Sequence, residues 1–312
     1  MLIVLVSAKG APGVTVATVA FAAAWPARWQ AAILECDPSG GDLAAAFGLN
    51  AEPGLLTLAS AVRRDHRAGL LWEHLQELPG GLPVVPAPAS AEQATAAIDV
   101  LMASPGLEAF HRLGSEPAGA DGGPTGAAAR PSRARVVEAV DEGVVLVDAG
   151  RLPAHLSQGA GASRLLSVAD VVLVVAANQQ AGIVHAAARL DALRSAAGGA
   201  EGRVRMVLVG SEAYSASEVA LALGVPVAGT LPVDERAAAI LLGRPARKAE
   251  DLGRLPLLRA AGAIGRQLAA EYRWANAVDP EPDTLERVTA FPGESRSRAR
   301  AGGDSSLREG AR

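Results

Sequence analysis

Residues 2–15 read LIVLVSAKGAPGVT, and this stretch decides the fold class. The apolar run 2–6 has strand length, the glycine-containing loop 9–13 follows directly, and Thr15 opens an Ala/Val-rich run with no helix breaker until Pro26. A strand, a glycine loop and a helix in this order place backbone N–H groups and a helix N-terminus against phosphate oxygens. Glycine is needed there because a side chain would keep the backbone away from the phosphate.

The same alternation of strand-like and helix-like runs continues along the chain. It predicts an α/β fold with a mostly parallel, doubly wound sheet flanked by helices. The expected strands are 2–6, 31–35, 82–86, 143–147, 170–176, 203–209 and 226–230. The expected helices are 15–29, 67–77, 90–112, 132–141, 159–168, 179–196, 215–223, 234–242 and 255–273.

Composition fits one such domain in a reducing compartment. The 312 residues are 50% hydrophobic, which is enough to bury a large core. The net charge of -4 gives no general attraction to nucleic acid. Cys36 is the single cysteine, which excludes an intramolecular disulfide, and neither a signal peptide nor a transmembrane run is evident. We therefore expect a cytoplasmic protein.

Two segments break the pattern and set the expected domain limits. Residues 114–131 are rich in Gly, Pro and Ala and read as a flexible surface insertion. From 278 to 312 the chain becomes polar and contains several prolines, which is typical of a disordered tail. The expected organisation is one nucleotide-binding domain over 1–277, interrupted by the insertion, and then the tail.

The loop departs from the standard Walker A box, G-x-x-x-x-G-K-[ST], because Val14 stands where that box has its lysine. Lys9 opens the loop instead, and it is one of two lysines among 29 basic residues. KGAPGVT resembles the deviant Walker A loop, K-G-G-x-G-K-[ST], of the MinD/ParA family of P-loop ATPases in the SIMIBI class. Ala11 replaces the second glycine of that pattern, and Val14 replaces its second lysine. In lacking this lysine the loop looks similar to CpaE, TadZ and BcsQ, which are atypical members.

The resemblance assigns roles to the loop. Lys9 corresponds to the signature lysine, which reaches the nucleotide of the partner subunit across a dimer. Thr15 corresponds to the hydroxyl that binds Mg²⁺. The phosphates would be held by the loop residues Gly10, Ala11, Pro12, Gly13, Val14 and Thr15.

Two acidic positions follow strands farther along the chain. Asp37 comes after the strand that ends at Glu35, and Asp148 comes after four apolar residues in the form of a Walker B strand. Ligands bind at the carboxyl edge of a parallel sheet, although each pattern also fits a plain strand exit. Similarity to the family's switch I and switch II implies that Asp37 orients the attacking water. It also implies that Asp148 and Thr15 hold Mg²⁺.

The resemblance implies an ATP- and Mg²⁺-binding protein, a slow ATP hydrolase that forms an ATP-dependent homodimer. Such a switch would position a cell-envelope, secretion or pilus apparatus, a septum or a chromosome, through a protein partner of that apparatus. Two alternatives stay open: a non-hydrolysing scaffold locked by ATP, and an ATPase that partitions DNA. Membrane association would be indirect, because the amphipathic run 255–273 is better suited to packing on the sheet. The adenine-recognising Asn of the family is not evident after the strand 203–209, where Gly210 and Ser211 stand.

Overall fold

The computed structural model describes residues 1–9, 13–27, 29–64, 70–103, 142–157, 159–210, 213–244 and 252–277. Contacts within the chain divide it into one compact unit, Met1–Tyr272, and a second unit, Arg273–Arg312. The expected insertion 114–131, the expected helix 132–141 and the expected tail 278–312 lie outside the described residues.

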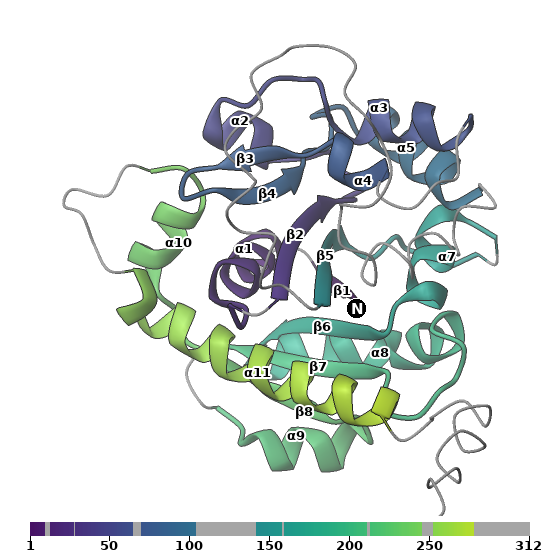
Figure 1. The fold of residues 1–312 in the computed structure, drawn as a ribbon. Helices are drawn as coiled ribbons and strands as arrows, with labels where there is room; N and C mark the ends of the chain where they lie inside the picture. The colour runs from purple at the N-terminus through teal and green to yellow at the C-terminus, as the bar shows by residue number, and fades with distance from the viewer. Residues whose placement is uncertain are drawn as a thin grey trace, which may run out of the picture. The chain divides into compact units, whose positions relative to one another are not determined.

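One sheet of eight strands runs through the first unit in the order β3-β4-β2-β5-β1-β6-β7-β8 (Figure 1). All strand pairs are parallel except β3–β4, so the predicted α/β class is confirmed. The strands are β1 Leu2–Ser7, β2 Trp29–Glu35, β3 Gln76–Leu78, β4 Leu82–Val85, β5 Glu142–Arg151, β6 Val171–Ala177, β7 Val204–Val209 and β8 Val227–Leu231.

Helices cover both faces of the sheet, as the sequence predicts. They are α1 Val14–Ala24, α2 Leu43–Phe47, α3 Leu55–Val62, α4 Leu70–Glu73, α5 Ala91–Ala103, α7 Gly161–Val168, α8 Gln180–Ala196, α9 Ala216–Leu223, α10 Glu235–Leu241 and α11 Pro256–Ala277, with a 3₁₀ turn η3 at Leu252–Arg254. Among the described residues, no helix has the length and apolarity that crossing a bilayer requires.

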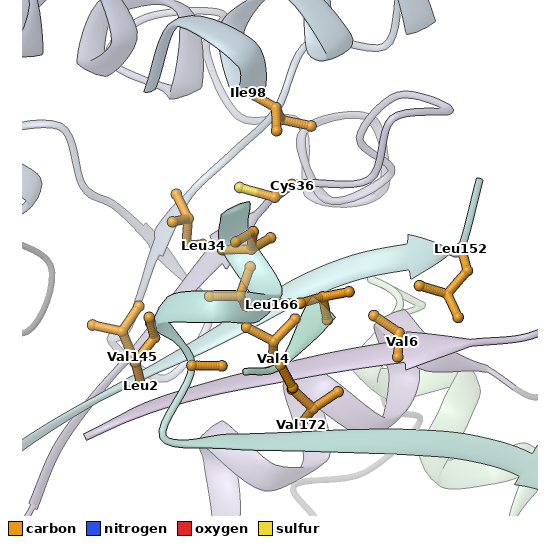
Figure 2. Packing of buried hydrophobic residues seen from close by; sticks show 14 of the residues in the cluster. Leu2, Val4, Val6, Leu34, Cys36, Ile98, Val145, Leu152, Leu166 and Val172 are labelled. Atoms are coloured by element: carbon orange, nitrogen blue, oxygen red, sulfur yellow. The ribbon is translucent and has the colours of Figure 1, made fainter. Parts of the chain in front are cut away.

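The core follows the alternation of side chains along β1. Ile3 and Leu5 point to the face covered by α1, α10 and α11, whereas Leu2, Val4 and Val6 point to the face covered by α3, α5, α7 and α8. Figure 2 shows the second cluster, with residues of β1, β2, β5 and β6 packed beneath helix residues; those labelled include Leu2, Val4, Val6, Leu34, Val145, Val172, Ile98 and Leu166. The core is therefore filled mainly by small aliphatic side chains, as expected for a sequence with few aromatic residues.

Helix α11 packs on the sheet, as its amphipathic pattern predicts. Leu257, Leu258 and Leu268 are buried in the α1-side cluster. The side chain of Glu271 accepts a hydrogen bond from Arg205 on β7, which ties the helix to the strand below it.

The segment after α3 corrects the prediction. A helix was expected over 67–77, but α4 is short and Gln76–Leu78 forms β3, antiparallel to β4. The turn Gly80–Gly81 has left-handed φ values of 90° and 78°, and it reverses the chain into a hairpin. The Gln76 amide donates to the carbonyls of Asn50 and Pro53, which joins β3 to the segment before α3. Helices α2 and α3 were also not predicted, because their periodic stretches are short.

Candidate functional site

The predicted residues meet at the carboxyl edge of the sheet, where β1, β2 and β5 end side by side. Sheet register places Asp148 of β5 opposite Leu5 of β1 on one side and opposite Glu35 of β2 on the other. The loop after β1 and the N-terminus of α1 lie at the same edge. This is the place where open parallel sheets bind ligands.

Only part of the predicted loop is described. Gly10, Ala11 and Pro12 lie outside the described residues. Gly13 has the left-handed conformation φ 78°, ψ 54°, precedes α1 as its N-cap, and makes no side-chain cap. The first turn of α1 also contains no acidic residue. Its N–H groups therefore remain available for an anion.

Asp148 and Thr15 lie side by side. The Thr15 hydroxyl is close enough to the Asp148 carboxyl to lower its pKa by hydrogen bonding. The backbone N–H of Gly150 donates to Asp148 Oδ1 at 3.0 Å. Burial raises the pKa of Asp148 to about 7; the charges of Glu35 and Asp37 also raise it, against the two hydrogen bonds. Asp148 is therefore a buried carboxyl group that lies near two other acidic side chains, Glu35 and Asp37.

Asp37 lies in the loop after β2 and approaches the end of β5. Its Oδ1 accepts from the backbone N–H of Ser39 at 2.7 Å. A side chain at Gly150 would overlap its carboxylate. The predicted switch residues Asp37 and Asp148 are therefore brought to one place by adjacent strands.

Glu35 is a feature that the sequence reasoning did not single out as a site residue. The residue is 1% exposed, and its carboxylate accepts three backbone N–H bonds, each of 2.9 Å. The donors are Asp42 and Leu43 at the start of α2, and Ala87 after β4. Burial raises the pKa of Glu35, while these three bonds oppose the rise. Glu35 fastens the loop that carries Asp37 to the neighbouring β4–α5 connection.

Close contacts at Gly41 also hold the loop after β2 against the β4–α5 connection. The Gly41 N–H donates to the Pro88 carbonyl at 2.9 Å. A Cβ at Gly41 would lie 2.6 Å from Glu35 Oε2 and 2.6 Å from the Ala87 carbonyl oxygen. The glycines of the DPSGG run therefore serve close packing between two loops, and a sequence alone does not reveal that requirement.

The two positions that carry lysine in the family pattern differ here. Val14 is buried in the α1-side core cluster and places no charge beside the loop. Lys9 is exposed, and its Nζ lies 3.2 Å from Nε2 of His185 on α8. One helical turn farther along α8, Arg189 donates to the carbonyls of Pro153 and Ala154, which follow β5. Helix α8 thus contacts both the Lys9 loop and the segment after Asp148.

The donor set fits Mg²⁺ held jointly with phosphate. Within the described part of the chain, no group of three His, Cys, Asp or Glu side chains is arranged to hold a metal. Thr15 and Asp148 nevertheless supply two adjacent oxygen donors beside the loop. Mg²⁺ takes one or two protein oxygens and completes its octahedron with phosphate and water, so these two residues suffice.

Comparisons with known proteins agree on the fold. No family model matches the chain, and no curated protein matches it. Among solved structures, MinD in the MinC:MinD cell division complex of Aquifex aeolicus is 16% identical over 86% of this chain and 95% of that chain, with a TM-score of 0.57. A ParA family ATPase from Chlorobium tepidum TLS is 16% identical over 85% and 98%, with a TM-score of 0.55.

A third structure carries a nucleotide. The septum site-determining protein MinD of Pyrococcus horikoshii OT3, complexed with Mg-ADP, is 16% identical over 86% of this chain and 95% of that chain, with a TM-score of 0.56. At this identity the likeness concerns the fold. The chain therefore has the eight-stranded α/β fold of the MinD and ParA ATPases.

Proposed function

We propose that this protein binds ATP with Mg²⁺ and uses it as a switch, with slow hydrolysis. The observation that carries the proposal is the contact between Thr15 and Asp148 beside the uncapped start of α1. A hydroxyl and a carboxylate that adjoin a helix N-terminus suit a metal–phosphate ligand. The solved MinD structure with Mg-ADP supports this choice of ligand.

Each residue then has a defined task. Backbone N–H groups of the loop residues from Gly10 to Thr15, except Pro12, would bind phosphate oxygens, and Thr15 and Asp148 would hold Mg²⁺. When bound there, Mg²⁺ would supply positive charge that offsets the charge on the transferring phosphoryl group. Asp37 orients the attacking water. Lys9 acts across a nucleotide-bound homodimer, as the resemblance of the loop implies.

The biological task that fits such a switch is positioning. We propose an ATP-dependent homodimer in the cytoplasm that engages a protein of an envelope, secretion, pilus or division apparatus. Neighbours named for cell division, in complex with MinC, and for the ParA family support this class. Partitioning of DNA is less favoured, since the chain carries a net charge of -4.

A non-hydrolysing ATP-bound scaffold is the second candidate, and one observation favours it. A standard loop places a lysine beside the phosphates at this position. Here the position holds Val14, which is uncharged and buried. Loss of one charged hydrogen bond of about 1.5–3 kcal/mol corresponds to roughly 10- to 150-fold in affinity or rate. Single-turnover measurement of ATP cleavage separates a slow hydrolase from a scaffold.

Calorimetry of the full chain with ATP, ADP and AMP in the presence of Mg²⁺ tests the proposal. We expect ATP to bind more tightly than AMP, because the loop recognises phosphates. Thr15→Ala should weaken the Mg²⁺ dependence of ATP binding, whereas Ser60→Ala removes an exposed hydroxyl of α3 and should change nothing. Equal or absent binding of all three nucleotides would refute the proposal.

A further inference from the structure

A bulge in β5 changes which side chain reaches the site. Leu5 of β1 pairs with Asp148, but Ser7, two residues later, pairs with Arg151, three residues later. The extra residue is accommodated where Gly150 has the left-handed φ of 56°. Bulges of this kind occur beside functional sites, where they redirect a side chain.

The direction of the change follows from strand alternation. Leu5 and Ser7 are two residues apart, so they share the face of β1 that α1 covers. Laterally paired residues lie on the same face of a sheet, which places Arg151 on the α1 face together with Asp148. Without the bulge, alternation along β5 would have sent residue 151 to the α7 side. The register therefore brings Arg151 to the last residue of β1, where the phosphate-type loop begins.

The charge of Arg151 is not used within the described structure. Its side chain is exposed, and it forms no hydrogen bond or ion pair with any residue that the structure describes. The other basic groups here are engaged, since Lys9 contacts His185 and Arg189 holds the carbonyls of Pro153 and Ala154. Among the described residues, Arg151 is thus a guanidinium without a partner, at the edge of the sheet where the acidic residues Asp37 and Asp148 lie.

We propose that Arg151 binds the terminal phosphate of the nucleotide in its own subunit, in place of the lysine that Val14 replaces. This inference rests on the proposed function. A guanidinium presents a planar fork of N–H donors that matches phosphate oxygens. Its place at the end of β5, next to the start of the loop, allows it to act without any movement of the buried Val14.

The experiment compares nucleotide affinities of the full chain by calorimetry with Mg²⁺. Arg151→Ala should weaken ATP binding by about 10- to 150-fold, the value of one charged hydrogen bond, and leave ADP binding as in wild type. Arg259→Ala is the matched control, because it removes an exposed arginine of α11 far along the chain. A thermal melt without nucleotide should be the same for both variants and wild type.

A second substitution tests the replacement directly. Val14→Lys in the Arg151→Ala background should restore most of the lost ATP affinity, since it returns a cation to the loop. ATP affinity unchanged by Arg151→Ala, in a wild type that binds ATP, overturns the inference alone. An equal loss for ATP and ADP also overturns it, because the effect is then not on the terminal phosphate. A wild type that binds no nucleotide overturns the proposed function and this inference with it.

Discussion

The carboxylate of Asp37 occupies the space that a side chain at Gly150 would need. Asp37 follows β2 and Gly150 lies near the end of β5, the neighbouring strand, so the contact joins the two segments expected to act as switches. Gly150 also has a left-handed backbone, which a residue with a Cβ adopts at a cost. One glycine therefore permits the approach of Asp37, the bulge of β5 and the placement of Arg151.

Gly150→Ala tests this relationship. We expect lower stability in denaturant unfolding, by about 1–2 kcal/mol from backbone strain alone and more from overlap with Asp37. ATP turnover should fall further than ATP binding, because Asp37 is displaced. Gly48→Ala is the control for strain, since Gly48 has φ 64° but no atom near the position of a Cβ. Equal stability of the two variants would contradict the close approach.

Glu35→Gln removes a charge that three backbone donors share. A glutamine keeps one acceptor oxygen but turns an NH₂ group toward N–H groups, so at least one buried donor loses its partner. We expect a loss of about 1–3 kcal/mol in unfolding free energy. The exposed Glu92 provides the matched control, and Glu92→Gln should stay close to wild type. A Glu35→Gln protein as stable as wild type would show that the three hydrogen bonds to Glu35 do not stabilise the Asp37 loop.

The raised pKa of Asp148 predicts how stability depends on pH. Between the ordinary value of 3.8 and about 7, the folded protein binds more protons than the unfolded chain. The free energy of unfolding therefore falls as pH rises through this window. The raised pKa of Glu35 makes the free energy of unfolding fall with pH in the same direction. The contribution of Asp148 is therefore the difference between the pH profiles of wild type and Asp148→Asn.

That difference is measured by urea unfolding from pH 4 to pH 8 without nucleotide. Asp148→Asn should have a flatter profile and be the more stable protein at pH 8, because the buried charge is gone. Two parallel profiles would show that Asp148 is not a strained carboxylate in the folded protein.

The fold was predictable because its strands are apolar runs separated by turn residues, and runs such as 2–6 and 170–176 match β1 and β6 closely. The contact of Thr15 with Asp148 was foreseen from the order of the loop and the Walker B-like strand. Other features depend on spatial contacts that no local pattern contains. Glu35 joins two loops only because the segment after β4 lies beside it. Arg151 reaches the α1 face only because of the bulge at Gly150.

Val14→Lys should raise ATP affinity or turnover, by about 10- to 150-fold if the ammonium reaches the phosphates. The substitution also removes a buried side chain from the α1-side cluster, so stability should fall. Val14→Ala separates the two effects, because it creates the packing defect without adding a cation. If Val14→Lys binds ATP like Val14→Ala, the loop is not aligned with the phosphate-binding pattern.

The last prediction concerns Lys9, which lies 3.2 Å from His185 in the single chain. If Lys9 acts across a dimer, Lys9→Ala should lower ATP-dependent dimerisation more than it lowers ATP binding. Lys9→Arg should fail almost as badly, because a forked guanidinium does not replace a compact ammonium in a closed site. His185→Ala removes only the contact within the chain, so dimerisation should be at least as strong as in wild type. Light scattering with and without ATP measures all four proteins. A wild type that stays monomeric at saturating ATP would refute the dimer. If the wild type dimerises and both Lys9 variants dimerise equally well, Lys9 has no role across the dimer.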